Sequence, residues 1–128
     1  MAIPALSIGV SALRMNETRV AVAADNIANA TNRVALDPAA RPQGETGYTP
    51  RTVAPVSLDG GGVRATIQAV DPASTAVPNG QGGVDAMPNV DLTTEIITLN
   101  DASRSYESAA SVIRTADEMQ QTLLDVVG

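Results

Sequence analysis

The side chains that most often perform catalysis are missing from this chain. Its 128 residues include no histidine, cysteine or lysine, so proton transfer and nucleophilic attack would depend on carboxylates, hydroxyls or arginines. The acids at 85, 91, 95 and 101 lack the spacing of a calcium-binding loop and are typical of a solvated face. We therefore predict no enzymatic activity, no catalytic residue, no metal site and no cofactor.

Two asparagine amides, Asn26 and Asn29, stand at the end of an apolar helical stripe. Residues 29–31 and 16–18 match the N-glycosylation pattern, but the N-terminus lacks the basic start of a secretory signal. Three-residue spacing places both amides on one side of a helix. We predict that they bind backbone or side-chain groups there, either within the subunit or across to a neighbouring subunit.

The composition indicates a thin core and excludes several partners. Hydrophobic residues make up 44% of the chain, but many are alanine, which buries little area, and the only aromatics are Tyr48 and Tyr106. The net charge of −6 and the absence of a basic patch argue against a nucleic-acid partner. No segment approaches the roughly 20 apolar residues of a membrane span, so we predict a protein that is not membrane-spanning.

The periodicity predicts a long helix at each end of the chain. Residues 4–30 carry apolar side chains at helical steps, with Glu17 as the one interruption. Residues 91–127 form a longer helix, capped by Asp91 or a neighbouring threonine, and their near-heptad spacing indicates coiled-coil-like packing. The two predicted stripes are Leu6, Val10, Leu13, Val20, Ala24 and Ile27, and Leu92, Ile96, Leu99, Ala102, Tyr106, Ala109, Ile113, Ala116, Leu123 and Val127.

The segment between the helices is predicted to hold one β-hairpin and two loops. Strands at 49–58 and 63–70 flank the turn Asp59-Gly60-Gly61-Gly62, which supplies the backbone freedom of a tight turn. In the second strand, Val63, Ala65, Ile67 and Ala69 should share one face. Residues 33–47 and 73–88 are predicted to be loops.

The predicted fold is mainly α: two long terminal helices packed as a coiled-coil-like pair, with a small β-hairpin and loop insert between them. The parts are an N-terminal helix at 1–32, an insert at 33–88 and a C-terminal helix at 89–128. One partner helix cannot cover stripes of this length, so other copies of the chain are expected to cover the remainder. The predicted subunit-interface residues are Leu13, Val20, Asn26, Ile27, Asn29, Leu92, Ile96, Leu99, Arg104, Tyr106, Ile113 and Leu123.

Tyr106 and Arg104 leave two interpretations open. Tyr106 brings the largest side chain on the stripe, and it could simply pack between helices with its hydroxyl at an edge. Alternatively, Tyr106 anchors a contact with another subunit while Arg104 pairs with a carboxylate of that subunit.

Three segments resemble the bacterial flagellar basal-body rod protein family. They are SALRMNETRVAVAADNIANATN, which contains an Asn-Ile-Ala-Asn motif, then GYTPRTV, and then MPNVDLTTEIITLNDASRSYESAASVIRTADEM. The last segment and the short length are similar to the small proximal rod subunits of C type. The resemblance covers both ends, about half of the chain.

The resemblance implies a self-assembling structural subunit of the rod, whose terminal helices build an axial tube that surrounds the export channel and transmits torque. It implies that the partners are other copies, other rod proteins and the flagellar type III export apparatus. The implied location is the basal body, where the rod crosses the periplasm after export without a cleavable signal. The alternatives are a distal rod or hook paralog with a reduced middle, a non-flagellar coiled-coil adaptor, and an enzyme that uses paired carboxylates.

Overall fold

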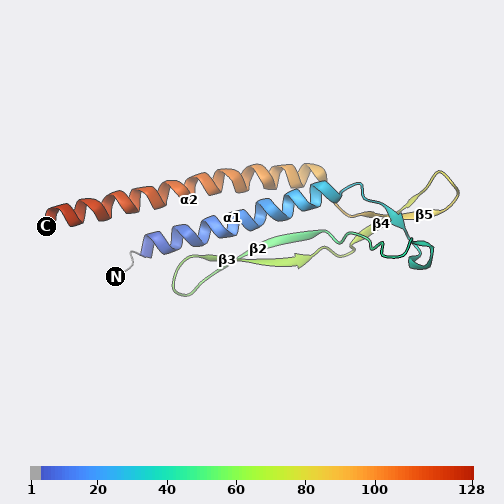
Figure 1. Cartoon of the computed structure of the whole chain (residues 1–128), viewed down its shortest axis with the longest axis horizontal. Helices are drawn as coiled ribbons and strands as arrows, with labels where there is room; N and C mark the ends of the chain where they lie inside the picture. The colour runs from blue at the N-terminus through green and yellow to red at the C-terminus, as the bar shows by residue number, and fades with distance from the viewer. Residues whose placement is uncertain (1–3) are drawn as a thin grey trace.

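The computed structural model describes residues 4–128 and has two long antiparallel helices that lie side by side (Figure 1). The prediction of a mainly α chain with a β insert is confirmed. The first helix, α1, spans Pro4–Asn29, and the second, α2, spans Leu92–Val127. The insert contains β1 (Val34–Ala35), the short 3-10 helix η1 (Pro38–Ala40), β2 (Arg51–Ser57), β3 (Val63–Ala69), β4 (Ser74–Pro78) and β5 (Val84–Pro88).

Asp91 determines where α2 begins. Its Oδ1 atom accepts hydrogen bonds from the backbone N–H groups of Thr93 (3.0 Å) and Thr94 (3.2 Å). These are two of the backbone donors that have no partner inside the first helical turn. Of the capping residues that the sequence allows, the aspartate is the one used.

The seam between the helices is built from small residues. The buried residues of α2 are Ala102, Ala109 and Ala116, which recur every seven positions. Facing them, α1 has Gly9, where a Cβ atom would lie only 2.7 Å from Cγ1 of Ile113. The helices therefore approach closely because their contact positions lack bulk.

The stripe predicted for α1 is partly wrong. The buried residues of this helix are Gly9, Asn16, Val22, Ala23 and Asn26, whereas Ala24 is exposed and the large apolar members of the predicted stripe are only half-buried. In α2 the alanines of the predicted stripe are buried, but Leu92, Ile96, Tyr106, Leu123 and Val127 are exposed. Large apolar side chains dominate a sequence-based stripe, whereas small residues fill this seam.

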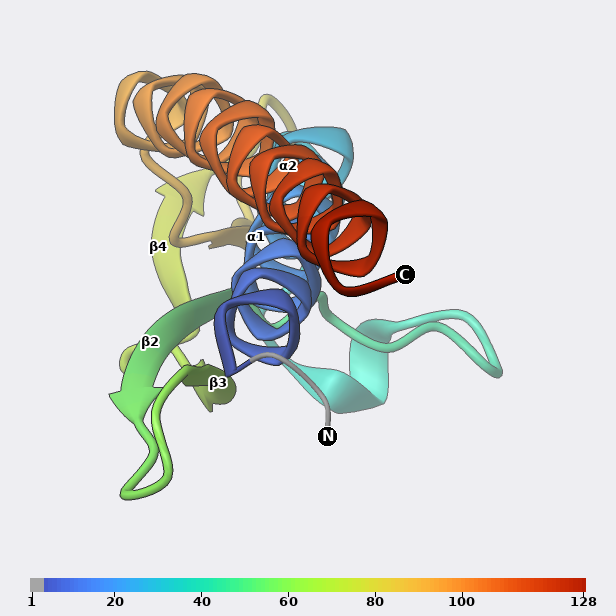
Figure 2. The same ribbon diagram turned by 90° about the vertical axis from the view of Figure 1, so that its left-hand side faces the viewer.

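The predicted hairpin is confirmed as an antiparallel pair, β2 with β3, and α1 lies between α2 and this hairpin (Figure 2). The backbone N–H of Val63 donates to Oγ of Ser11 (3.0 Å), which attaches the hairpin tip to α1. Gly62 (φ +94°) is required there, because a Cβ atom would lie 2.6 Å from that Oγ. The predicted face is only partly covered: Val63 and Ala65 are half-buried, but Ile67 is 48% exposed.

Residues 73–88 form a second hairpin, so their prediction as a loop is wrong. Strands β4 and β5 pair antiparallel, and β1 adds to β5, giving the order β1-β5-β4. In the turn, Oδ1 of Asn79 accepts from the N–H groups of Gln81 (3.2 Å) and Gly83 (2.7 Å). The loop predicted at 33–47 likewise contains β1 and η1. These strands gave no strand signal because β1 has only two residues and because β4 and β5 are short and each end in proline.

Neither of the two long helices is apolar enough over a sufficient length to span a membrane, within residues 4–128.

Because small residues fill the seam between α1 and α2, a larger side chain should destabilise the fold at a buried seam position but not at an exposed one. Replacing Ala102, which is 0% exposed, by leucine should lower the free energy of unfolding by about 1–3 kcal/mol, since a packed contact must open to admit the side chain. Ser105→Leu, at an exposed position of the same helix, should change it by less than about 0.5 kcal/mol. Urea unfolding measures both, and equal effects would contradict the proposed close seam.

Candidate functional site

The amide of Asn26 joins three parts of the chain at the end of α1. Its side chain is 0% exposed and makes four hydrogen bonds. The Nδ2 atom donates to the backbone carbonyl of Arg51 (2.7 Å) and to Oε1 of Glu95 on α2 (2.9 Å). The Oδ1 atom accepts from the hydroxyl of Tyr48 (2.8 Å) and from the backbone N–H of Arg51 (3.1 Å). Both donors and both acceptor positions of the amide are therefore used.

The contact with Arg51 resembles strand pairing. The backbone N–H and C=O of Arg51 point away from β3, because the hydrogen-bonded pairs of the hairpin fall on alternate residues that include Pro50 and Val70. The side-chain amide of Asn26 presents one acceptor and one donor to these two groups, as a neighbouring strand would. Asn26 thus closes the edge of β2 and fixes the hairpin to α1.

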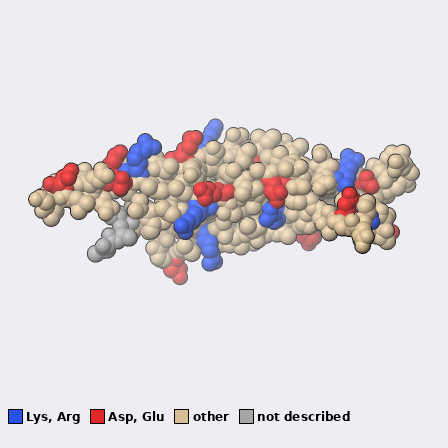
Figure 3. Space-filling model, viewed as in Figure 1, with Lys and Arg blue, Asp and Glu red and all other residues tan. Residues whose placement is uncertain are grey.

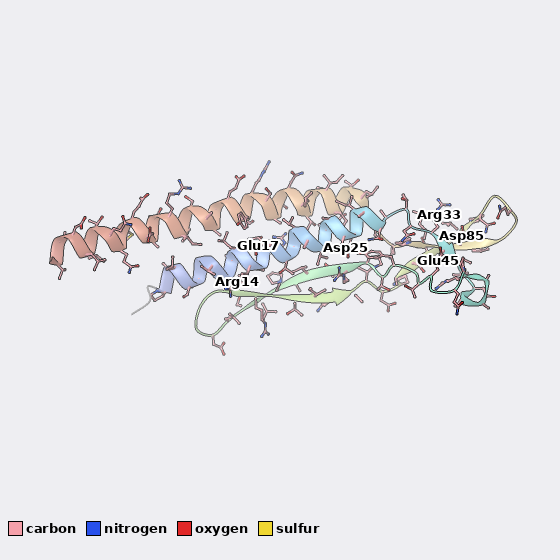
Figure 4. The ribbon with its side chains drawn as sticks, viewed as in Figure 1. Arg14, Glu17, Asp25, Arg33, Glu45 and Asp85 are labelled. Carbon is pink, nitrogen blue, oxygen red and sulfur yellow. The ribbon has the colours of Figure 1, made fainter. Side chains whose placement is uncertain are left out.

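Asp25 supports this junction of α1, the β2–β3 hairpin and α2 from the partly exposed side. One carboxylate oxygen forms an ion pair with the guanidinium of Arg51 and lies 3.2 Å from the hydroxyl of Tyr48. Asn29 donates to the other oxygen (3.1 Å) and to the backbone carbonyl of Asp25 (2.9 Å). The side chains of Asp25 and Arg51 are 42% and 40% exposed, so their ion pair adds at most about 1 kcal/mol. Figure 4 shows Asp25 near the end of α1.

Two pKa values reflect this cluster. Burial, followed by the negative charge of Asp25, raises the pKa of Tyr48 above its ordinary value of 10.0. The hydrogen bond to Asp25 raises the pKa of Arg51. The hydroxyl of Tyr48 therefore keeps its proton, and with it the hydrogen bond to Asn26, through the neutral pH range.

The prediction that the two asparagines bind groups at the junction is confirmed, and the contacts lie within the subunit. Asn26 is buried, whereas Asn29 is half-buried and acts on Asp25 of its own helix. Sequence reasoning missed the partners Asp25, Tyr48, Arg51 and Glu95. The signal available was the segment of residues 47–53, which places a tyrosine and an arginine immediately before the hairpin.

The other predicted interface residues lie mainly along the helices. Leu13, Val20, Ile27, Leu99 and Ile113 are half-buried between elements of the subunit, and Leu92, Ile96, Arg104, Tyr106 and Leu123 are exposed. Val20 and Tyr106 line a groove of about 560 Å³ between α1 and α2, together with Glu17, Ala21, Ser103 and Glu107. Whether these residues contact another subunit stays a prediction.

Features of catalytic and ligand sites are few in this structure. Within residues 4–128, no group of three or more acids is placed to hold a metal ion. Acidic and basic side chains are interspersed along the face shown in Figure 3. The polar groups that do converge, around Asn26, satisfy one another, so this cluster holds the chain together.

Comparison with known proteins identifies the class. The model of the family described as "Flagellar basal body rod FlgEFG protein C-terminal" matches residues 81–126, which include β5 and nearly all of α2. The chain is 32% identical to the flagellar basal-body rod protein FlgC of Yersinia enterocolitica over 124 residues, covering 88% of this chain and 87% of that protein. It is 30% identical, over the same shares, to FlgC proteins of Escherichia coli.

The chain therefore belongs to the flagellar basal-body rod protein family, and its relatives are of the proximal rod type that the sequence resembles.

The junction predicts a large effect of removing the Asn26 amide. Asn26→Ala should lower the free energy of unfolding by about 2–4 kcal/mol, because part-buried backbone groups of Arg51 and the carboxylate of Glu95 lose their partner. Asn26→Asp keeps the shape but removes both donors and places a charge beside Glu95, so it should destabilise at least as much.

Asn32→Ala is the matched control, since Asn32 is exposed and its one side-chain contact is 3.5 Å long. It should cost less than about 0.5 kcal/mol in urea unfolding. An Asn26→Ala chain as stable as the Asn32→Ala chain would show that the junction does not hold the fold together.

The raised pKa of Tyr48 predicts a loss of stability in alkali. A proton held more tightly in the folded chain stabilises the fold below pH about 10. This contribution is lost as the pH rises through the raised pKa of the folded state, because the unfolded tyrosine ionises first. In a Tyr106→Phe background Tyr48 is the one tyrosine left, so the absorbance of tyrosinate measures the pKa of Tyr48 alone. Replacing Tyr48 by phenylalanine should flatten the alkaline limb of the stability profile, and an unchanged limb would contradict this role.

Proposed function

We propose that this chain is a non-catalytic structural subunit of the flagellar basal-body rod, which assembles with other copies and other rod proteins into an axial tube. In this proposal the tube surrounds the export channel and transmits torque. The names of the relatives support the rod assignment. The structural observation that supports assembly is an apolar surface of α2 that is exposed in the described part of the chain.

That surface is concentrated where α2 extends past the start of α1 (Figure 1). Its large apolar members are Met119, Leu123, Leu124, Val126 and Val127, which are 59–85% exposed. Next to it, Ala5, Val112, Ala116 and Met119 line a groove of about 490 Å³. Apolar area of this kind stabilises by roughly 25 cal/mol per Å² when it is covered, so it favours association.

We infer that neighbouring subunits cover this surface by coiled-coil-like packing. The seven-residue recurrence of Ala102, Ala109 and Ala116 supports this geometry, because it leaves α1 and α2 close together with large side chains on the outer faces. Exposed Tyr106 then anchors a contact in the groove beside Val20, and Arg104 pairs with a carboxylate of another subunit. The remaining predicted interface residues flank these positions along both helices.

The proposal also assigns a role to each part of the chain and a location to the whole subunit. Residues 1–32 and 89–128 act as the two rod helices and residues 33–88 as an insert that contacts neighbours. The chain is exported by the flagellar type III apparatus and takes its place in the rod where it crosses the periplasm. The identity to proximal rod proteins favours this position over that of a distal rod or hook paralog.

The exposed apolar surface predicts that a substitution there can block assembly while the isolated chain still folds. Leu123→Asp should leave the unfolding of the isolated chain within about 0.5 kcal/mol, because Leu123 is 59% exposed. The same change should abolish swimming and remove the chain from isolated basal bodies, since a charge cannot be buried without a partner.

Gln120→Asp is the control, because it places the same charge at an exposed polar position of the same segment. Cells carrying it should swim. Normal motility of the Leu123→Asp strain would contradict the proposed assembly surface.

A further inference from the structure

The turn between β4 and β5 is built around one side chain, that of Asn79. The backbone N–H of Asn79 donates to the carbonyl of Gly83 (3.0 Å), and its side-chain Oδ1 accepts from the N–H groups of Gln81 (3.2 Å) and Gly83 (2.7 Å). Its Nδ2 atom donates to Oδ1 of Asp85 on β5 (3.0 Å). The side-chain amide therefore has three partners. Figure 1 shows this turn at the end of the molecule opposite both chain termini.

The two glycines beside this amide differ in what the fold requires of them. A Cβ atom at Gly83 would lie 2.9 Å from Nδ2 and 3.2 Å from Oδ1 of Asn79, so the amide keeps its position only because Gly83 has no side chain. A Cβ atom at Gly80 would meet nothing within 4 Å among the described residues, and the φ angle of Gly80 is not positive. The turn therefore needs a glycine at 83 but not at 80.

The sequence at this turn allows a reaction of the chain with itself, because Asn79 is the one asparagine that is followed by glycine. The backbone nitrogen of Gly80 can attack Cγ of Asn79. The bond from that nitrogen to Cγ forms, the bond from Cγ to Nδ2 breaks, and ammonia leaves with the proton of the Gly80 N–H. Water then opens the five-membered imide to aspartate or isoaspartate. Glycine favours the attack because it has no side chain to obstruct it and has wide backbone freedom.

We propose that Asn79 and Gly80 form a deamidation site that is controlled by the conformation of the turn: the folded turn protects Asn79, and opening of the turn allows the reaction. Ring closure brings Cγ to bonding distance of the Gly80 nitrogen, and this movement draws the amide away from Gln81, Gly83 and Asp85. The cost of losing these three hydrogen bonds adds to the barrier of the reaction in the folded chain. Exclusion of water plays no part, because Gly80 is exposed.

The product does not fit the folded turn. A carboxylate at position 79 still accepts from Gln81 and Gly83, but it has no donor for Asp85, so two negative charges meet where a hydrogen bond of 3.0 Å now lies. Asp85 belongs to the central strand of the sheet β1-β5-β4, opposite Val77 and Ala35. Deamidation therefore weakens the hairpin after the turn has once opened. This inference goes beyond the proposed rod function and does not depend on it.

Peptide mapping of the full-length protein tests the protection. The chain is incubated in mildly alkaline buffer with and without urea, and mass spectrometry measures aspartate and isoaspartate at residue 79. We expect the reaction to be at least several-fold faster in urea. Gly80→Ala is the matched control, because it obstructs the attack without a contact in the turn. It should react slowly under both conditions.

Gly83→Ala tests whether the hydrogen bonds of the amide provide the protection. The added Cβ atom displaces the flexible Asn79 side chain and leaves Gly80 unchanged. Without urea, this chain should deamidate several-fold faster than the original chain. Asp85→Ala removes one of the three partners and should accelerate the reaction less. If Gly83→Ala disturbs the whole fold by circular dichroism, the rate of the Asp85→Ala chain decides.

Two results would overturn the protection. One is an equal rate for the original chain with and without urea. The other is a faster reaction in the folded chain, which would mean that the N–H groups of Gln81 and Gly83 stabilise the negative oxygen of the attacked amide instead.

Asn79→Asp reproduces the aspartate product and tests its effect on the hairpin. Hydrogen exchange of the backbone amides of β5 should be faster in this chain than in the original one. Adding Asp85→Asn exchanges donor and acceptor between the two positions, so slow exchange should return. If the second substitution does not restore slow exchange, repulsion between positions 79 and 85 is not what weakens the hairpin, and the proposed effect of the modification is wrong.

Discussion

The buried amide of Asn26 is the contact on which the arrangement of this subunit depends. It is the one side chain that binds both the β2–β3 hairpin and α2 from within α1. A buried amide with four partners stabilises only if all four are in place, because each lost partner leaves a desolvated polar group. The helix end, the hairpin and the start of α2 must therefore adopt one relative position. Tyr48, Asp25 and Asn29 surround this contact and restrict the same geometry from outside.

The rest of the core is thin, and this has consequences for function. Alanine and glycine occupy much of the seam between the helices, so α1 and α2 bring their backbones together while most of the large apolar side chains of α2 lie outside it. Those side chains remain at the surface, most of all beyond the end of α1. A subunit built in this way specifies its own shape through a polar junction and leaves much of its apolar area exposed. That division suits a structural subunit of the rod.

The sequence was sufficient for the long elements and insufficient for the short ones. Both helices were predicted within about a residue of their ends because apolar periodicity persists over many turns. The hairpin at β2–β3 was found because its glycine turn is strong. The hairpin at β4–β5 was missed because its strands have five residues each and its turn depends on Asn79 side-chain bonds, which periodicity does not reveal.

The sequence predicted where the junction lies but not which residues bind Asn26 there. The amides at 26 and 29 stand out in the sequence because they interrupt an apolar stripe, but Glu95 lies 69 residues away and Arg51 lies 25 away. Only the fold brings such groups together. The orientation of α1 was misjudged for a related reason: buried Asn16 and Gly9 carry no hydrophobic signal, so the true contact face is displaced from the large apolar residues.

Electron cryomicroscopy of intact basal bodies would show the position and the surroundings of this chain. We expect an antiparallel pair of helices at the rod, with the hairpin held against α1 and with residues 119–127 of α2 covered by neighbouring subunits. A position outside the rod, or exposure of residues 119–127 to open solvent within it, would show that this surface of α2 does not serve assembly.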